Sequence, residues 1–295
     1  MKTNINITRL PNYPQTLHLT TPHGVPLLQF ACFQDIPFIT HCFTTRMGGT
    51  STGIYESMNF KEDGDDLNEN IRANYRIIAQ ALDADVTKMV RPSLVHGTQV
   101  HEVTAEDFGV GALYKSTLTG IDALITNISG VTLVATFADC VPLYFVDPKH
   151  RAIGLAHSGW KGSCHKIALS VLTAMRTAYG TEPGDILAAI GPCICGDCYE
   201  VGEELDTEFQ KGFAGKIEEQ TGIRYRETIM RPGRREGKYQ LDLRQANLQT
   251  FLAAGIPREQ IAIADICTCC NPQLIFSHRA TNGKRGASAA FLGLK

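Results

Sequence analysis

Residues 124–157 read LITNISGVTLVATFADCVPLYFVDPKHRAIGLAH, and this stretch decides the fold. It holds the short apolar runs LITN, VTLVATF, VPLYFVD and AIGLAH, with the turn pair Asp147-Pro148 between the last two. Short runs rich in β-branched and aromatic residues, bounded by turn residues, are typical of strands. Their close succession along the chain favours antiparallel pairing. The stretch therefore predicts a series of strands in a sheet.

Helical periodicity appears on both sides of these strands. Apolar residues recur at helical spacing over residues 66–83, which predicts an amphipathic helix. The same period over residues 161–179, ended by Gly180, predicts one long helix. We expect further helices over 201–213 and 242–254, and further strands at ILAAI (186–190), IAIADI (261–266) and ASAAFLGL (287–294). This mixture of hairpins and helices predicts an α+β fold.

Composition and charge narrow the class of protein. The 295 residues are 43% hydrophobic and 20% charged, which is enough apolar content for a large core, and no Pro/Gly/Ser-rich linker divides them. We therefore predict a single domain over residues 1–295. The formal net charge of -2 argues against nucleic acid or anionic lipid as a partner and favours a small-molecule substrate. No secretory leader or apolar run of about 18 residues is present, so a cytoplasmic location is expected.

The ten cysteines raise the question of metal binding or catalysis, because thiols in the cytoplasm stay reduced. Several of them are grouped, and the groups could hold a second zinc ion or an iron–sulfur cluster, or they could be buried reduced thiols. The sequence leaves both alternatives open. The groups are Cys193, Cys195 and Cys198, and then Cys267, Cys269 and Cys270.

Three other potential ligands stand at or just beyond apolar strand-like runs. His96 follows PSLV, Cys140 follows VTLVATFAD, and His157 follows AIGLA. Two imidazoles and one thiolate suit zinc, and three protein ligands leave a fourth position for water or substrate. The alternative is a buried thiol with two satisfied core histidines. Spacing alone does not decide between them.

The residues around these ligands resemble a known family. The ordered motifs are TRMGG (45–49), VHG (95–97), DALIT (122–126), ADCVP (138–142), AHSGWKG (156–162), GPCI (191–194), YEVG (199–202) and FSHR (276–279). Together they resemble the laccase-domain family, once called multicopper polyphenol oxidases and now associated with purine nucleoside phosphorylases. Leu94, Cys195 and the stretch 280–283 depart from the usual pattern. Because the stretch 280–283 differs, the substrate preference of the family is a weaker expectation for this chain than its metal site.

The resemblance implies a fold, a metal site and an activity. The implied fold is a four-layer αββα sandwich, and the implied metal ligands are His96, Cys140 and His157, which are also the expected catalytic residues. The implied metal is zinc, with copper as an alternative. The implied reaction is phosphorolysis of adenosine, inosine and methylthioadenosine to free base and ribose 1-phosphate or its methylthio analogue, with an added adenosine deaminase activity. Purine nucleosides and phosphate are then the partners.

Two arginines are candidates for substrate binding. Arg46 precedes Gly48-Gly49, where a guanidinium fork and close backbone approach suit phosphate or ribose. Arg279 is the second candidate, and a surface ion pair is the alternative for either. Asp139, beside Cys140, is interpreted as structural more readily than as a catalytic acid or base. Tyr55, Trp160 and His278 could contact a purine, although core packing is the more ordinary role for such side chains.

Other functions remain open at this point. Cys140 could be the nucleophile of a deamidase or cysteine hydrolase, with a histidine as base. A copper-dependent phenol oxidation could occur as a side reaction, but one His/Cys/His site lacks the several copper centres of a true laccase. A metal-stabilised binding protein without catalysis is the alternative outside enzymology.

Overall fold

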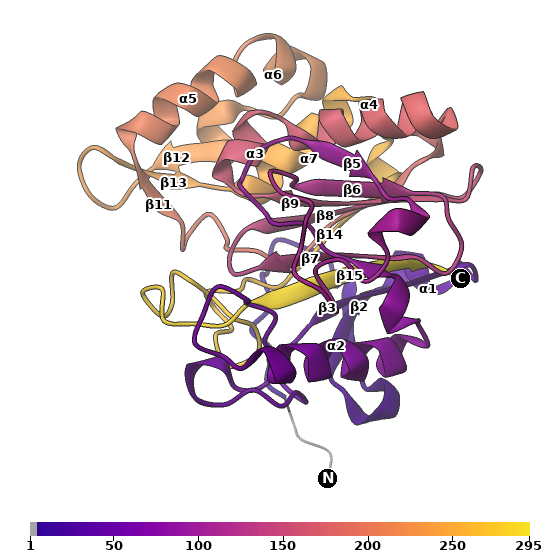
Figure 1. Ribbon diagram of the computed structural model, residues 1–295. Helices are drawn as coiled ribbons and strands as arrows, with labels where there is room; N and C mark the ends of the chain where they lie inside the picture. Colours follow the sequence, from indigo (N-terminus) through magenta and orange to yellow (C-terminus); the bar gives the residue numbers. More distant parts are fainter. Residues whose placement is uncertain (1–4) are drawn as a thin grey trace.

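The computed structural model describes residues 5–295 and contains two six-stranded sheets that lie face to face (Figure 1). The first sheet has the order β1 (Leu17–Thr20), β2 (Leu27–Phe30), β3 (Ile39–Thr44), β15 (Ser288–Leu294), β7 (Thr132–Phe137), β4 (Met89–Val90). The second has the order β14 (Ile261–Ile263), β10 (Leu187–Ile190), β8 (Val141–Asp147), β9 (Ala152–Ser158), β6 (Ala123–Thr126), β5 (Val100–Glu102). Both sheets are mixed. Among the described residues, three pairs of neighbouring strands are parallel, namely β4/β7, β10/β14 and β5/β6, and the other pairs are antiparallel.

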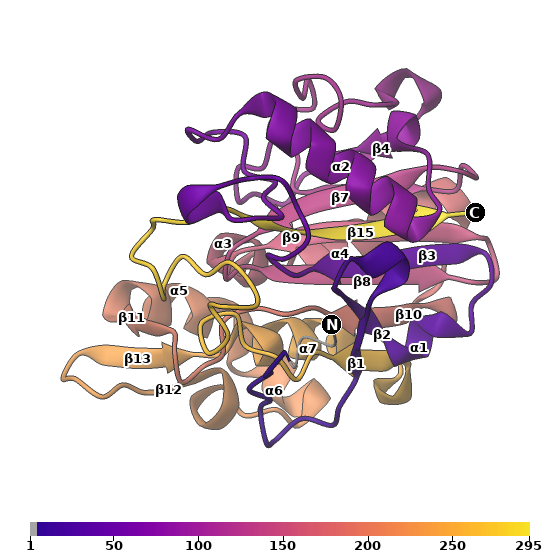
Figure 2. The same ribbon diagram turned by 90° about the horizontal axis from the view of Figure 1, so that it is seen from below.

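Helices cover both outer faces, which confirms the predicted α+β sandwich of mixed sheets. Helix α2 (Asn68–Leu82) lies on the first sheet, and Figure 2 shows it crossing β7, β15 and β3. The other face carries α3 (Trp160–Cys164), α4 (Ile167–Tyr179) and α7 (Leu243–Ala253), with α5 (Glu203–Phe213) and α6 (Lys216–Thr221) beyond them. The short α1 (Ala31–Gln34) follows β2. A small third sheet has the order β11 (Glu200–Gly202), β13 (Lys238–Leu241), β12 (Met230–Pro232).

The core is layered in the same way. Tyr144 and Leu155 belong to the apolar cluster between the two sheets, whereas Phe145 belongs to the cluster under α4 and α7. Every residue of β8 is buried, because successive side chains alternate between two covered faces. This double burial explains why the run VPLYFVD is apolar almost throughout.

The strands predicted within residues 124–157 are present, but their pairing differs from the prediction. Strands β6, β8 and β9 pair antiparallel as expected, whereas β7 lies in the other sheet between β15 and β4. The chain therefore crosses from one sheet to the other between Phe137 and Val141. Periodicity cannot reveal this crossing, because both strands are buried. Cys140 lies in the crossing segment.

The helix over residues 66–83 is confirmed by α2, and the long helix over 161–179 is corrected. It is divided into α3 and α4 at Lys166, whose φ of 58° is left-handed. A single residue in this conformation ends one helix and redirects the chain, and the apolar period does not register it. The break leaves Trp160 at the start of a separate short helix, next to His157.

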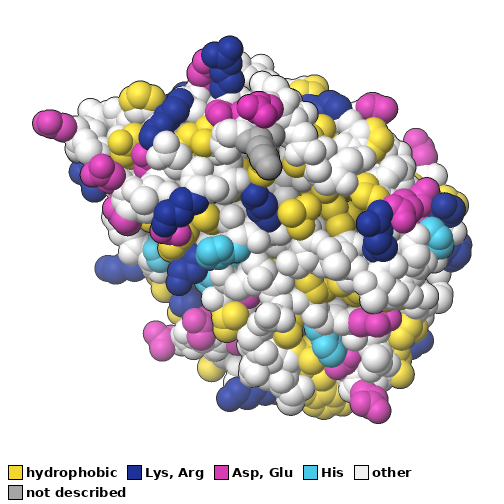
Figure 3. Space-filling view, turned by 90° about the horizontal axis from the view of Figure 1, so that it is seen from above, with side chains coloured by type: hydrophobic (Ala, Val, Ile, Leu, Met, Phe, Trp, Pro, Cys, Tyr) yellow, Lys and Arg dark blue, Asp and Glu magenta, His cyan; other side chains and the backbone are white. Residues whose placement is uncertain are grey.

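Charges of both signs are interspersed on the helical face seen in Figure 3. No helix of residues 5–295 is long and apolar enough to cross a membrane.

Candidate functional site

The three predicted metal ligands come together although they lie far apart in the sequence. Cys140 precedes β8, His157 lies in β9, and His96 lies in the loop between β4 and β5. Residue 142 pairs with His157 across β8 and β9, which brings Cys140 beside that histidine. One ligand atom of each residue lies within 4.8 Å of the others, and the two imidazoles meet edge to face. This group is named the His/Cys/His centre below.

Asp122 orients the centre from behind. This buried carboxylate accepts a hydrogen bond from His157 Nδ1 at 3.0 Å and from the backbone N–H groups of His96 at 2.9 Å and Gly97 at 2.7 Å. With Nδ1 engaged, His157 presents Nε2 to the centre. A carboxylate behind a metal-binding histidine is a common arrangement that fixes the tautomer. In the sequence, Asp122 is recognisable only as the first residue of the DALIT motif, and no local pattern indicates this role.

Backbone geometry also shapes the centre. His96 has a φ of 63° and Asp139 a φ of 89°, both in the left-handed region that non-glycine residues rarely adopt. Asp139 is held there by its carboxylate, which accepts hydrogen bonds from Thr268, Ser277 and the backbone N–H of Arg279 at 2.6–2.7 Å. These contacts support the structural interpretation of Asp139.

Gly159 lies against all three ligands. A Cβ at this position would stand 2.9 Å from His96 Cδ2, 3.3 Å from Cys140 Sγ and 3.8 Å from His157 Cε1. The first distance is shorter than real carbon contacts allow. A residue without a side chain is therefore needed for the imidazole of His96 to reach the centre.

The charges within the centre favour an ionised thiol. Burial opposes ionisation of Cys140, but the charge and hydrogen bonds of His157 and His96 outweigh it and lower the pKa of the thiol to about 6. Burial likewise opposes protonation of His157, yet the Cys140 thiolate and the Asp122 carboxylate raise its pKa to about 9. Without metal, Cys140 and His157 form a thiolate–imidazolium pair.

The donor set fits one borderline-soft divalent cation. The thiolate form of Cys140 is the form that ligates metal, and Asp122 leaves His157 Nε2 free to do so. Three protein ligands leave a coordination position open, and the centre borders cavities on two sides. The arrangement therefore has the form of a catalytic rather than a closed structural metal site.

The first cavity is polar and has a volume of about 340 Å³. It is bordered by His96, Cys140 and His157 and by the charged side chains of Lys61, Glu62, Asp63, Arg91 and Arg285. Arg91 is ion-paired with Glu62. Arg285 forms no salt bridge within residues 5–295, and its buried Nε has no hydrogen-bond partner there. Burial lowers the pKa of this guanidinium, while the charges of Asp139, Cys140 and Asp63 act in the opposite direction without outweighing it.

The second cavity lies on the other side of Cys140 and has a volume of about 400 Å³. Its walls carry Trp160, Tyr199 and Leu243, with His278 and Arg279 at exposed positions. His96, Ala138, Cys140 and Arg285 border both cavities. The centre therefore stands at the junction of a polar and an aromatic cavity. The second cavity is called the aromatic cavity below.

The two predicted substrate arginines occupy different places. Arg279 borders the aromatic cavity, lies over the ring of Tyr199, and donates to the carbonyls of Cys198 and Glu200 at 3.2 Å. Arg46 donates to the carbonyls of Glu56 and Pro272 at 2.9 Å, lies over Phe276, and borders neither cavity. Substrate binding by Arg46 stays a prediction, and its visible contacts hold its own loop.

The secondary candidates also separate. Trp160 and His278 border the aromatic cavity, whereas Tyr55 is buried and its hydroxyl accepts from the backbone N–H of Asp65 at 3.0 Å. Tyr199 and Arg285 were not proposed from the sequence. Tyr199 stands in the quoted motif YEVG, while no local pattern distinguishes Arg285 from other basic residues near the C-terminus.

Residues 40–295 match the family described as multi-copper polyphenol oxidoreductase laccase. The chain belongs to this family. Among its relatives is a protein named purine nucleoside phosphorylase YlmD from Geobacillus stearothermophilus, 36% identical over 85% of this chain and 88% of the relative. Another, named adenosine deaminase RL5 from an unknown prokaryotic organism, is 31% identical over 80% of this chain and 86% of that one.

Solved structures support the fold assignment within this laccase-like family. The crystal structure of YlmD from Geobacillus stearothermophilus superposes with a TM-score of 0.85 at 32% identity, covering 96% of this chain and all of the other. The family thus includes relatives named as phosphorylases and one named as a deaminase, and the chain is an enzyme of this family. The family description names several copper ions, whereas the His/Cys/His centre offers ligands for a single ion.

Proposed function

We propose that this protein is a metal-dependent purine nucleoside phosphorylase that acts on adenosine, inosine and methylthioadenosine and also deaminates adenosine. The observation that carries the proposal is the position of the His/Cys/His centre between an aromatic and a polar cavity. A nucleoside has an apolar, stackable base at one end and a polar sugar at the other. The two cavities offer surroundings of those two kinds on either side of one reactive centre.

The aromatic cavity would take the purine. Trp160 and Tyr199 provide aromatic surfaces, and Leu243 adds an apolar contact. Stacking on aromatic rings binds any purine, so adenine and hypoxanthine would both be accepted. Arg279 and His278 at the exposed rim would donate hydrogen bonds to the base. A rim of this kind suits a leaving group on which negative charge develops.

The polar cavity would take phosphate, with Arg285 as its main partner. In phosphorolysis a phosphate oxygen forms a bond to C1′ of the ribose while the bond from C1′ to the base nitrogen breaks. The bonding electrons leave with the base, which then gains a proton. The guanidinium of Arg285 would hold the phosphate beside the sugar, because Arg91 is already neutralised by Glu62.

The metal would be held by His96, Cys140 and His157. We propose zinc, with copper as the alternative that the same donors accept. A bound divalent ion of this kind lowers the pKa of water, which is the chemistry that deamination of adenosine requires. Asp122 would keep the tautomer of His157 fixed. The proposed location is the cytoplasm, where thiols such as Cys140 stay reduced.

The test is release of free base from adenosine, inosine and methylthioadenosine, with and without phosphate, together with metal analysis. We expect phosphate-dependent release by the wild type, and in Cys140→Ala we expect loss of that release together with loss of the metal ion of the His/Cys/His centre. Cys32→Ala is the matched control, because Cys32 is an exposed thiol outside the site. Full metal content and full phosphorolysis in Cys140→Ala would refute the proposal.

One observation favours a second candidate. Cys140, His157 and Asp122 stand in the order thiolate, imidazolium, carboxylate, which is also the arrangement of a cysteine hydrolase. Such an enzyme would use Cys140 as a nucleophile and would need no metal. Removal of the metal by a chelator separates the two, because it would abolish phosphorolysis but would leave a cysteine hydrolase active.

A further inference from the structure

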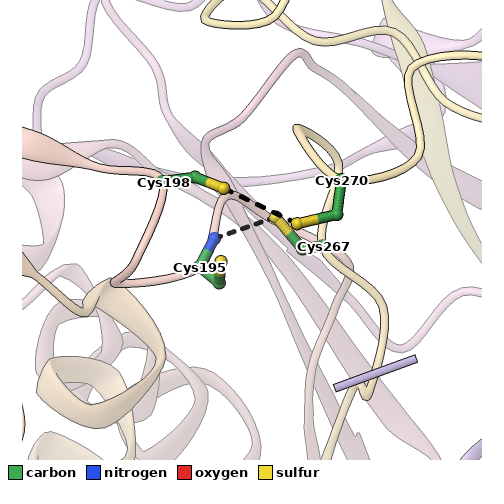
Figure 4. A group of neighbouring side chains, drawn as sticks. All are labelled: Cys195, Cys198, Cys267 and Cys270. Carbon is green, nitrogen blue, oxygen red and sulfur yellow. Dashed lines mark hydrogen bonds between the residues drawn. The ribbon is translucent and has the colours of Figure 1, made fainter. Parts of the chain in front are cut away.

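Four cysteines outside the His/Cys/His centre converge on one point. Cys195 and Cys198 lie in the loop between β10 and β11, and Cys267 and Cys270 lie after β14 (Figure 4). All four sulfur atoms lie within 4.8 Å of one another, and those of Cys198 and Cys270 are 3.6 Å apart. We propose that these four thiols bind one structural zinc ion as a closed tetrathiolate site.

The spacing of the sulfur atoms matches a mononuclear ion. Zinc–sulfur bonds of about 2.3 Å in a tetrahedron place the sulfur atoms about 3.8 Å apart. A disulfide requires about 2.05 Å, so the Cys198–Cys270 pair at 3.6 Å is too long for one. The four cysteines of an iron–sulfur cluster are divided among two or four iron atoms, so those on different irons must stand farther apart than ligands of a single ion. The observed separations favour one shared ion.

The local sequence has the form that zinc sites use. Cys195 and Cys198 are separated by two residues, and so are Cys267 and Cys270. Two such pairs supply four thiolates from two tight turns, which is the usual construction of a structural zinc site. The backbone N–H of Cys195 donates to Cys267 Sγ at 3.2 Å, a contact that favours the thiolate form of the sulfur.

A buried arginine supplies the charge that such a site needs. Arg244 is fully buried, and its guanidinium donates to the carbonyls of Cys193, Ile194 and Ile266, the residues next to the two cysteine pairs. It forms no salt bridge within residues 5–295, and the carboxylate of neighbouring Asp242 caps helix α7. Asp242, Cys193 and Cys267 are the negative groups that act on this guanidinium, and a buried cation without a direct ion pair is costly. Zinc with four thiolates carries two negative charges, which would compensate Arg244.

The position of the site gives the zinc a consequence for the aromatic cavity. Its two loops carry Ile194 and Tyr199 on one side and lead to His278 and Arg279 on the other. Thr268, inside the second cysteine pair, also donates to Asp139 beside Cys140 at 2.6 Å. The ion would link the two loops that form these walls of the aromatic cavity. Through Thr268 it would also link them to the segment that carries Cys140. This consequence rests on the proposed function, but zinc binding itself does not.

The test is the zinc content of the full chain expressed with added zinc. We expect two zinc ions per chain in the wild type, one in Cys140→Ala and one in the double variant Cys198→Ser/Cys270→Ser. Cys269→Ser is the matched control, because Cys269 lies within the same turn but outside the four, and it should keep both ions.

A spectroscopic measurement tests the proposal without the double variant, in case Cys198→Ser/Cys270→Ser does not fold. X-ray absorption at the zinc edge of Cys140→Ala should show four sulfur ligands at about 2.3 Å and no nitrogen. A single zinc in the wild type that Cys140→Ala loses would overturn the proposal. Detection of iron together with sulfide in the purified protein would also overturn it. So would a protein mass lower by the two hydrogens lost when two of these cysteines form a disulfide. None of these results depends on whether the protein cleaves nucleosides.

Discussion

The two cysteine-containing clusters use the same sulfur chemistry in opposite ways. The His/Cys/His centre has three ligands, a carboxylate behind one histidine, and a cavity on each side. The four-cysteine cluster has a complete set of thiols and a buried guanidinium next to it. An incomplete ligand set leaves room for a reactant, whereas a complete set leaves none. Ligand number and surroundings, more than ligand type, therefore separate a reactive site from a structural one.

The largest loss of activity is expected from Asp122→Asn. This substitution removes the carboxylate behind the His/Cys/His centre and leaves the four-cysteine cluster unchanged. An amide can accept from fewer of the groups that Asp122 now holds, and it adds donors facing backbone N–H groups. Loss of such a partner commonly lowers metal affinity by about 10- to 100-fold. We expect activity to fall by about 100-fold at limiting zinc and to recover in part with excess zinc.

Competition with a chelator, read as zinc per chain, checks this prediction at both clusters. The four-cysteine ion should be retained in Asp122→Asn at the wild-type level. Equal loss of both ions would mean that the two clusters are not independent, and the comparison would fail.

The next effect concerns the open side of the His/Cys/His centre. Arg285→Gln removes a cation that borders both cavities and forms no salt bridge within residues 5–295. Hydrogen bonds to charged groups contribute about 1.5–3 kcal/mol, so the KM for phosphate should rise by about 10- to 100-fold. Deamination uses no phosphate and should change far less. Steady-state rates of both reactions on adenosine measure the difference, and an equal loss in both would place Arg285 elsewhere in the mechanism.

The three ligands of the His/Cys/His centre could be proposed from the sequence because the motifs around them resemble those of a known family, whereas their spacing alone left a buried thiol and two core histidines as the alternative. His96, Cys140 and His157 each stand in a short motif that carries its own strand end or turn. Helix α2 could also be predicted from the sequence, because its apolar residues recur at helical spacing over four turns. Asp122 belongs to the DALIT motif, but its role depends on the loop that carries His96, which is distant in the sequence and contacts Asp122 only in the folded chain.

The remainder depends on relations that no local pattern records. Strands β7 and β8 are both buried, so nothing in their periodicity assigns them to different sheets. Arg285 is distinguished by its position beside both cavities and by its lack of a salt bridge within residues 5–295, and neither property is visible in the sequence. The two cysteine pairs were visible as groups, but their union requires the parallel bridge between Cys193 and Cys267. Both the crossing at Cys140 and the four-cysteine cluster are products of tertiary contact.

A smaller effect is expected from Gly159→Ala, which tests how tightly the His/Cys/His centre is packed. The added Cβ would stand 2.9 Å from His96 Cδ2, so the imidazole must shift by a few tenths of an ångström. Such displacements of a positioned group cost about tenfold in rate. Gly162→Ala is the matched control in α3, because its nearest neighbours are at 3.4 Å or more. Wild-type kinetics in Gly159→Ala would show that His96 is not held against this glycine.

The smallest effect separates Cys140 from an ordinary thiol in metal-free protein. The thiolate–imidazolium pair lowers the pKa of Cys140 from 9.0 to about 6, so at pH 7 about nine-tenths of it is ionised instead of about one-hundredth. A less basic thiolate is also a weaker nucleophile, by about 20-fold for this shift, which leaves a net gain of about fourfold in alkylation rate. The sign follows from the lowered pKa: the rate should fall as pH drops through about 6 and should level off above pH 7. Iodoacetamide labelling of Cys140, followed by peptide mass spectrometry between pH 5 and pH 9, measures the profile. A rate that kept rising to pH 9 would mean that His157 does not hold the thiolate, and restoring zinc should suppress the labelling because the ion occupies the same sulfur lone pairs.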